Sequence, residues 1–343
     1  MNQERLSIPE KRTQQVFMEK KFQLLLFVFK FLGGRWNQKV NINAVLNPAV
    51  ILVTGASGQI GSYVFESLAD REEVIGVDLK ECPIRDLRDF FVLGDLRDEK
   101  LAERLVRDAD VIIHLAAQVS VERSWEDPVF DAENNLIATV NLLKYCDGQK
   151  FIYFSSAAVY GNPVYVPIDE EHPKNPMSPY GASKLAGEYY CKVYSEKVDP
   201  VILRPFNVFS PRMDPNNPYS GVISKFISRA KQGLPPVIFG DGKQTRDFVH
   251  VRDVVEFVKI AMKRGKSCEA YNVGTGKETS ILDLAEMILE IANLDLKPVF
   301  SEPRKGDIRR SFANIEKAKG IGFEPKTDLR RDLEEIFNKF EMI

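Results

Sequence analysis

The feature that most limits the possible folds of this chain is a glycine-rich segment close to residue 55. Val50–Val53 is a short apolar run typical of a buried strand, and an amphipathic stretch follows to about Ala69. Between them, Thr54–Gly61 has the spacing G-x-x-G-x-x-G. Such a strand-to-helix turn presents backbone amides at a helix N-terminus, where a pyrophosphate binds. The residues expected to bind a dinucleotide there are Gly55, Ser57, Gly58, Gln59, Ile60 and Gly61.

Two points qualify this interpretation. The usual fingerprint is G-x-G-x-x-G, and glycines alone also fit a sharp turn without a ligand. Context favours the cofactor, because further apolar runs follow at the spacing of a parallel sheet. These are Val74–Val77, Phe90–Leu93, Val111–Leu115 and Phe151–Phe154, with helical patterns such as 134–145 between several of them. The pattern predicts an α/β fold with a Rossmann-type doubly wound parallel sheet.

The amino-acid composition of the chain changes after residue 204. Residues 205–220 contain four prolines and three asparagines, which is typical of a long ordered loop. Further on, we expect helices at 221–232 and near 282–292, a strand and turn at 235–242, and a return to the main sheet at 249–262. The expected organisation is an N-terminal extension of unknown role (1–48), an NAD-binding domain (49–205 plus about 245–272) and a smaller C-terminal α/β substrate-binding lobe (206–244 plus 273–343).

Composition excludes several classes of function. The 343 residues carry a formal net charge of −2, so the chain lacks the basic signature of a nucleic-acid-binding protein. Four cysteines stand far apart with no C-x-x-C pair, and three histidines are too few to suggest a metal cluster. A reduced, cytoplasmic protein without a metal is the expected class.

The first 48 residues differ from the rest, with a net charge of +5. Their apolar segment at 22–32 is interrupted by Lys30 and is shorter than the roughly 18–20 residues that span a bilayer. We expect no membrane span and favour an amphipathic helix that packs on the body, a partner or a membrane surface. A signal peptide and a poorly ordered extension are the alternatives.

An acidic residue stands where a cofactor ribose is expected. Asp78 follows the second predicted strand, 17 residues after Gly61. A carboxylate there accepts hydrogen bonds from a free ribose diol and repels a 2′-phosphate, which favours NAD over NADP. Lys80 and Arg85 nearby weaken that preference.

Two further residues follow or lie within strands. Asp95 is placed to contact an adenine edge, and a simple loop cap is an equal alternative. His114 lies in an apolar strand and is interpreted as a packed core histidine.

Ser156, Tyr180 and Lys184 form the expected catalytic set. Tyr180 and Lys184 are four residues apart, so on a helix they share a face. A neighbouring ammonium favours a phenolate, which lets a group with a reference pKa of about 10 act as a base near neutrality. Ser156 follows the fifth strand, at the sheet edge where ligands bind in such folds. Combined with the glycine turn, the set predicts removal of a hydroxyl proton during hydride transfer.

These motifs resemble those of the extended short-chain dehydrogenase/reductases, and among them the UDP-hexose 4-epimerases. The resemblance runs from about Val50 to the C-terminus. It rests on the matching segments Thr54–Gly61, Gly94–Leu96, His114–Ala117, Phe154–Gly161, Ser178–Lys184, Arg204–Asn207, Gly240–His250 and Arg304–Asp307.

The resemblance implies roles for individual residues. Tyr180 would be the base, Lys184 would bind the nicotinamide ribose, and Ser156 would bind the sugar hydroxyl. Further cofactor contacts would come from Leu96, Leu115, Ala116, Ala117 and Asn135. On the substrate side the expected residues are Asn207 on the diphosphate or sugar, Phe239 in the nucleotide slot, Arg246 and Arg304 on the diphosphate, and Asp307 on the uridine ribose.

Two positions at which this sequence differs from related enzymes narrow the choice of reaction and of substrate. Related 4,6-dehydratases carry an acid pair directly after the position of Ser156, whereas this chain has Ala157 and Ala158. Without an acid, the 4-keto sugar has few routes except return of hydride, so we expect a 4-epimerase. Some epimerases have a large aromatic residue at the position of Ser311, and serine leaves room for an N-acetyl group. Ser311 therefore predicts that UDP-N-acetylhexosamines are accepted along with UDP-glucose and UDP-galactose.

Other interpretations stay open. A UDP-glucuronate 4-epimerase or a 4,6-dehydratase has the same fold, and a non-catalytic NAD-binding regulator would need no base. By analogy with the family, a homodimer is expected, formed through the helices at about 128–145 and 179–194.

Overall fold

In a computed structural model, the protein is described over residues 49–339 apart from 71, 214–220 and 305. The expectations for residues 1–48 lie outside this range.

The core is a seven-stranded parallel sheet with the strand order β11-β6-β5-β4-β1-β2-β3. The order reverses between β1 and β4, which creates the switch point where such sheets bind ligands. The predicted doubly wound α/β fold is confirmed. Its strands are β1 (Val50–Thr54), β2 (Glu73–Asp78), β3 (Phe91–Leu93), β4 (Val111–His114), β5 (Lys150–Phe154), β6 (Asp199–Pro205) and β11 (Ala270–Val273).

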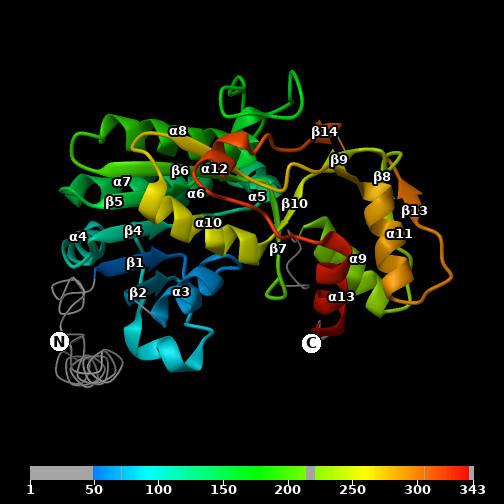
Figure 1. The fold of residues 1–343 in the computed structure, drawn as a ribbon, viewed down its shortest axis with the longest axis horizontal. Coiled ribbons are helices and arrows are strands. Elements are labelled where there is room, and N and C mark those ends of the chain that lie inside the picture. Colours follow the sequence, from blue (N-terminus) through cyan, green and yellow to red (C-terminus); the bar gives the residue numbers. More distant parts are fainter. Residues whose placement is uncertain (1–48, 71, 214–220, 305, 340–343) are drawn as a thin grey trace, which may run out of the picture.

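Helices cover both faces of the sheet, because its apolar strands must be buried on both sides (Figure 1). One face packs against α3 (Gly61–Ala69) and α10 (Val251–Arg264). The other face packs against α4 (Glu99–Arg107), α7 (Ala138–Tyr145) and α8 (Pro179–Val193). Helix α8, which carries Tyr180 and Lys184, is therefore held against the sheet beside β5.

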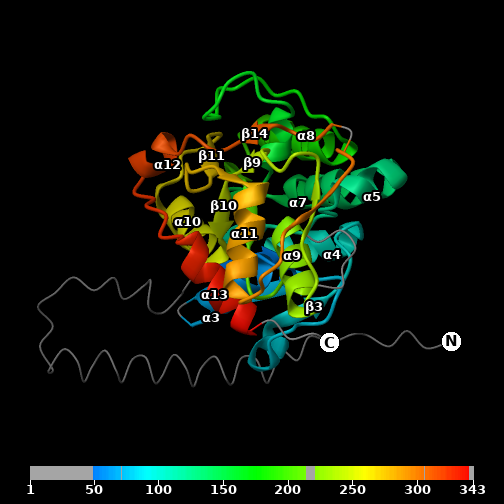
Figure 2. The ribbon, with the colours of Figure 1, turned by 90° about the vertical axis from the view of Figure 1, so that its right-hand side faces the viewer.

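A second group of elements has an apolar core of its own, built around Phe226, Leu284 and Leu333. Figure 2 shows α9, α11 and α13 side by side at the front of the molecule. The members are α9 (Val222–Lys231), β8 (Val237–Phe239), α11 (Ile281–Ile291), β13 (Val299–Ser301) and α13 (Leu329–Lys339). A small sheet joins β12 (Thr279–Ser280), β9 (Thr245–Arg246) and β14 (Arg310–Ser311). The predicted boundaries between the two lobes stay a prediction.

Two expectations for the middle of the chain were wrong. The segment 249–262 is mostly helix α10, and the strand that returns to the main sheet is β11. The expected loop at 205–220 contains β7 (Asn207–Phe209), which pairs in parallel with β10 (Phe248–His250).

Shorter helices complete the fold. They are η1 (Arg85–Phe90), α5 (Val121–Glu126), α6 (Pro128–Ala132), the π-helix η2 (Glu133–Ile137), η3 (Ala157–Tyr160) and α12 (Glu316–Gly320). Within the described part of the chain, every helix is too short or too polar to cross a bilayer.

Candidate active site

The glycine turn leaves no room for side chains where it meets its neighbours. Gly55 has a φ of +69°, and a Cβ there would lie 2.7 Å from the backbone nitrogen of Ala116. A Cβ on Gly61 would lie 2.0 Å from the carbonyl oxygen of Gly55. Helix α3 begins at Gly61 without a side-chain cap, while the amides of Ser62 and Tyr63 donate to the carbonyl oxygens of Gly58 and Ile60. The turn thus has the form that a pyrophosphate requires.

The acid expected to bind the ribose lies directly beside this turn. Asp78 ends β2, and its carboxylate accepts hydrogen bonds from the amides of Ser57 and Lys80, each at 3.0 Å. The hydroxyl of Ser57 donates to the carbonyl oxygens of Lys80 and Glu81. These bonds hold the carboxylate of Asp78 next to the glycine turn, where a carboxylate is needed to bind the ribose hydroxyls of NAD.

Asp95 has the environment of a loop cap. Arg97 binds its carboxylate with both the guanidinium and the backbone amide, and this pairing lowers the pKa of Asp95. An adenine contact by Asp95 stays a prediction. Leu96 next to it is buried, and its carbonyl oxygen accepts from the side chain of Asn141.

The segment after β4 lies against the glycine turn. The amides of Leu115 and Ala116 donate to the carbonyl oxygen and the hydroxyl of Thr54. Ala117 continues this partly buried loop. The three residues expected to contact the cofactor therefore lie beside the turn.

His114 is a packed core histidine, as predicted. It is buried, and burial lowers its pKa to about 3, so the ring is neutral. Its ring nitrogens lie 2.7 Å from the hydroxyl of Thr54 and 2.9 Å from that of Thr139. Thr139 in turn donates to the carbonyl oxygen of Asn135. Sequence reasoning missed that this ring connects the glycine turn to the helix of Asn135.

Ser156 and Tyr180 meet at the carboxyl end of β5. Ser156 caps η3 by accepting from the amide of Ala158 at 3.1 Å, and its side chain lies close enough to Tyr180 to oppose part of the rise in the pKa of that phenol. Tyr180 lies in the first turn of α8, which Ser178 caps at Gly181. The structure thus brings together two residues that lie 24 positions apart in the sequence.

Lys184 lies one turn further along α8 and is buried. Its Nζ donates to the carbonyl oxygen of Phe154 at 2.8 Å and lies 5.4 Å from the ring centroid of Tyr153. Burial lowers the pKa of Lys184 to about 8, against the opposing effect of Asp131. An ammonium held on β5 beside Tyr180 is suited to bind a ribose hydroxyl.

The acidity of Tyr180 differs from our expectation. We expected Lys184 to lower the pKa of the phenol, but the pKa of Tyr180 is raised. Desolvation by burial is the largest cause, and the hydrogen bond from Ser156 only partly opposes it. The physical reason is that removing water destabilises the phenolate.

Asn135 lies in the π-helix η2, a form of helix frequent at functional sites. Its oxygen accepts from the amide of Gln118 at 2.7 Å, and its amide group donates to Asp131 and Ser183. Neither Gln118 nor Asp131 was singled out from the sequence. The signal that was available is the position of Asp131, four residues before Asn135 on the same helical face.

A buried ion pair supports the catalytic helix from the other side. Arg204 binds Glu188 through two hydrogen bonds of 2.8 and 2.6 Å, and both side chains are almost fully buried. Glu188 lies one turn after Lys184 and also accepts from the hydroxyl of Ser155 at 2.5 Å. This pair links α8 to β5 and β6 and was also missed, because nothing in the local sequence indicates the partner of Arg204.

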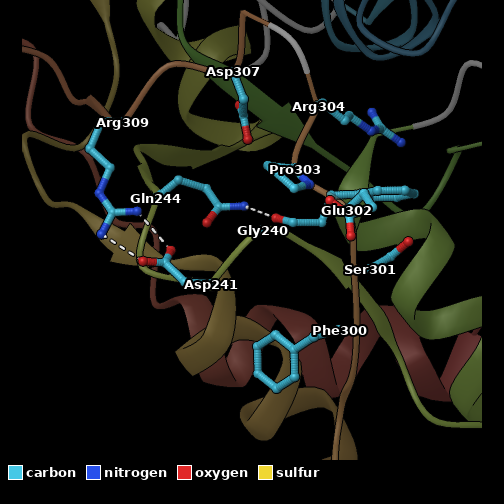
Figure 3. A pocket seen from close by; sticks show the side chains of 11 residues that line it. Gly240, Asp241, Gln244, Phe300, Ser301, Glu302, Pro303, Arg304, Asp307 and Arg309 are labelled. Atoms are coloured by element: carbon cyan, nitrogen blue, oxygen red, sulfur yellow. Dashed lines mark hydrogen bonds and ion pairs between the residues drawn. The ribbon is translucent and has the colours of Figure 1, made fainter.

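Three of the expected substrate residues, Phe239, Arg304 and Asp307, line an open cleft of about 810 Å³ (Figure 3), whereas Arg246, Ser311 and Asn207 are not among its lining residues. The guanidinium of Arg304 lies 4.2 Å from the ring centroid of Phe239 and forms an ion pair of 3.5 Å with Glu122 of α5. Glu122 follows β4, so the cleft lies close to the carboxyl edge of the main sheet. Phe239 and Arg304 are thus placed side by side, and their contacts with a base and a diphosphate stay predictions.

Arg246 and Asp307 are brought together as an ion pair. Arg246 also donates to the carbonyl oxygen of Ile308 at 2.7 Å, while Asp307 lines the cleft. Ser311 is buried and pairs with Arg246 in the register of β14 and β9. Asn207 is exposed on β7, next to Val208, whose carbonyl oxygen accepts from the side chain of Gln59 in the glycine turn.

The chain has close relatives of similar fold. The family model described as "NAD dependent epimerase/dehydratase family" matches residues 51–274. The UDP-glucose 4-epimerase of Mycolicibacterium smegmatis is 39% identical over 296 residues, which cover 81% of this chain and 94% of that protein. A UDP-glucose 4-epimerase from Thermotoga maritima, solved with UDP-glucose, has a TM-score of 0.79 and 37% identity over 84% of this chain and 98% of that chain.

Other matches carry different names. A UDP-glucuronic acid 4-epimerase from Bacillus cereus, solved with UDP-glucuronic acid and NAD, has a TM-score of 0.78 and 32% identity over 84% of this chain and 98% of that chain. A dTDP-D-glucose 4,6-dehydratase from Bos taurus is 32% identical over 302 residues, 80% of this chain and 84% of that protein. The chain belongs to the NAD-dependent epimerase/dehydratase family. Its cofactor is NAD, which fits the close backbone approaches at Gly55 and Gly61 and the carboxylate of Asp78.

Proposed function

We propose that this protein is a UDP-hexose 4-epimerase that interconverts UDP-glucose with UDP-galactose and UDP-N-acetylglucosamine with UDP-N-acetylgalactosamine. The observation that carries the proposal is that Ser156, Tyr180 and Lys184 gather at the carboxyl end of β5, in the same parallel sheet whose strand β1 leads into the glycine turn, with alanines at 157 and 158. With NAD as the hydride acceptor, a base, a hydroxyl and an ammonium are the groups that reversible oxidation of an alcohol needs. They do not supply the acid that elimination of water needs.

Each residue has a distinct part in the proposed reaction. Tyr180 removes the proton from the sugar 4-hydroxyl, and Ser156 holds that hydroxyl by a hydrogen bond. NAD held at the glycine turn, Asp78 and Lys184 would supply the hydride acceptor and donor for C4. Tyr180 then returns the proton to the opposite epimer. General acid–base catalysis of this kind contributes about 10²–10⁴-fold to the rate.

The second lobe holds the part of the substrate that does not react. Arg246 and Arg304 supply guanidinium groups, which suit a diphosphate because they form paired hydrogen bonds with its oxygens. With the diphosphate held, the sugar ring is free to turn between the two half-reactions. Phe239 and Asp307, which line the same cleft, are proposed to contact the base and the ribose of the nucleotide.

The carboxylates near the base support epimerisation over dehydration. Asp131 and Glu188 are buried and already accept hydrogen bonds from several donors. Ala157 and Ala158 form η3, directly after Ser156. Positions 157 and 158, where a dehydratase carries its acid pair, thus have no titratable side chain.

The breadth of the substrate class depends on Ser311. This buried residue pairs with Arg246 across two short strands, which places a small side chain beside a residue proposed to bind the diphosphate. A small side chain leaves space for an N-acetyl group. We therefore propose that the pocket accepts acetylated sugars.

The test is a panel of UDP-sugars incubated with the purified protein, with each product identified by NMR. The expected result is a C4 epimer of the glucose and N-acetylglucosamine substrates, without net consumption of NAD. A 4-keto-6-deoxy product would instead indicate a dehydratase. Turnover of UDP-glucuronate alone would move the assignment to a glucuronate epimerase, and binding of NAD without turnover of any sugar would indicate a regulator.

We also propose that the protein forms a homodimer through the helices at 128–145 and 179–194. Tyr189, Tyr190 and Val193 are exposed on the outer face of α8, and Val129 is exposed on the neighbouring α6. Large apolar side chains gathered on adjacent helices are typical of an interface. A second copy of the chain would bury this face by helix-to-helix packing.

A further inference from the structure

One buried carboxylate next to the proposed catalytic pair has no part in the mechanism described so far. Asp131 lies on the short helix α6 and is 1% exposed. Its Oδ1 accepts from the side-chain amides of Gln118 at 2.8 Å and Asn135 at 3.1 Å. Its Oδ2 accepts from the hydroxyl of Ser183 at 2.7 Å. Buried carboxylates are rare unless they are paired with a charge or serve a function.

The three donors come from three separate parts of the site. Gln118 belongs to the loop after β4, Asn135 to the π-helix η2, and Ser183 to α8, directly before Lys184. Ser183 lies 52 residues from Asp131 in the sequence. A single carboxylate therefore joins the cofactor-side loop and helix to the helix that carries the base.

The charge of Asp131 is not neutralised by these contacts, because all three donors are neutral groups. Lys184 is buried with a carbonyl oxygen as its hydrogen-bond acceptor. The negative charge of Asp131 favours the charged form of this lysine, and the same carboxylate disfavours the phenolate of Tyr180. In a desolvated site such charge effects are larger than in water.

We propose that Asp131 is a positioning residue for the Tyr180–Lys184 pair: it orients Ser183 and Asn135 by hydrogen bonds, and its negative charge keeps Lys184 protonated. This inference rests on the proposed function of the same site. In this role Asp131 touches neither the sugar nor the reacting atoms.

The other titratable groups around α8 leave Asp131 as the effective anion. Burial raises the pKa of the thiol of Cys191 and of the phenol of Tyr153, so both are neutral near pH 7. His114 is neutral for the same physical reason. Several other charged groups on the packed elements have partners of their own, as in the pairs Arg204–Glu188, Arg97–Glu133, Arg304–Glu122 and Lys144–Glu99. Arg123 stacks over Phe130, and Tyr160 donates to Asn272. Glu126 and Asp127 lie exposed at the end of α5, and Lys192 lies exposed in the last turn of α8.

The sign of the effect follows directly. Removing the negative charge of Asp131 destabilises the ammonium, so the pKa of Lys184 falls. It also stabilises the phenolate, so the pKa of Tyr180 falls as well. The base then ionises at lower pH and the lysine loses its proton at lower pH. Both limbs of the pH–activity profile should move in the same direction.

The test is Asp131→Asn, which removes the charge and keeps the shape. Its amide nitrogen can donate to the oxygen of Ser183, whose own proton then goes to the carbonyl oxygen of Tyr180, 3.0 Å away. We expect the pH–kcat profile to shift to lower pH by about one unit. We expect the phenolate absorbance of Tyr180 to titrate about one unit lower as well. Tyr180→Phe, made in the wild type and in Asp131→Asn, gives the absorbance of the other tyrosines, which is subtracted.

Asp127→Asn is the matched control. Asp127 is exposed at the N-terminus of the same helix and caps the amide of Phe130 at 3.0 Å. Asparagine is an equally good cap, so this variant removes one charge near the site without changing the helix. Its pH profile and phenolate titration should match those of the wild type.

The outcomes separate the two proposals. A phenolate titration in Asp131→Asn equal to that of the wild type would overturn the inference, even if catalysis weakened. If Asp131→Asn does not fold, Asp131→Ser takes its place with the same two outcomes. If the wild type epimerises no UDP-sugar, the proposed function fails, while the phenolate titration still decides the role of Asp131.

Discussion

Replacing Arg204 with methionine should destabilise the protein far more than any surface substitution of the same kind. Arg204 is 1% exposed and makes four hydrogen bonds: two to Glu188, one to the hydroxyl of Tyr160 at 2.9 Å and one to the carbonyl oxygen of Glu170 at 3.1 Å. Methionine fills much of the volume but leaves the carboxylate of Glu188 buried, with the hydroxyl of Ser155 as its remaining donor.

The magnitude follows from that uncompensated charge. Removing one partner of a buried ion pair costs about 3–5 kcal/mol, against a typical domain stability of about 5–15 kcal/mol. Removing both partners costs much less, because no buried charge is left. The double variant Arg204→Met/Glu188→Leu should therefore be more stable than Arg204→Met, with a coupling free energy of about 2–3 kcal/mol.

The assay is equilibrium unfolding in urea, followed by intrinsic fluorescence. Arg330→Met is the control, because Arg330 forms an exposed ion pair of 2.7 Å with Glu290 and its unfolding midpoint should not change. The reasoning would be refuted if Arg204→Met were as stable as Arg330→Met. It would also be refuted if the double variant were less stable than Arg204→Met.

Three further predictions concern the site and the assembly. Tyr180→Phe should lower kcat by about 10²–10⁴-fold and still retain NAD, measured by turnover and by cofactor release on denaturation; substantial turnover would remove Tyr180 from its role as the base. Ser311→Tyr should lower activity on UDP-N-acetylglucosamine more than on UDP-glucose, and an unchanged ratio of kcat/KM values would contradict the pocket argument. The double variant Tyr189→Glu/Val193→Glu should convert a dimer into a monomer in analytical ultracentrifugation, whereas Leu296→Glu, at an exposed position of the other lobe, should not.

Much of the fold was predictable because its signals are local. The buried strands are short apolar runs, and the turn between Thr54 and Gly61 needs glycine at the close approaches that the structure shows. The segment 249–262 was expected to return to the main sheet, and most of it is helix α10, which packs against that sheet, because a short apolar run does not separate a buried helix from a strand. The pairing of β7 with β10 joins residues 41 positions apart, and neither strand has a sequence pattern that indicates the other.

By itself, the sequence determined which chemical groups are present and in what order. Four-residue spacing places Tyr180 and Lys184 on one helical face, and alanines at 157 and 158 remove the acids from that site. Only the tertiary structure decided the electrostatics. Burial raises the pKa of Tyr180 where a neighbouring lysine alone predicts a fall. It also selects Asp131 and Glu188, rather than the many exposed acids of this chain, as the carboxylates that act on α8. The physical reason is that a charge acts strongly only where water is excluded, and the exclusion of water depends on packing between distant segments.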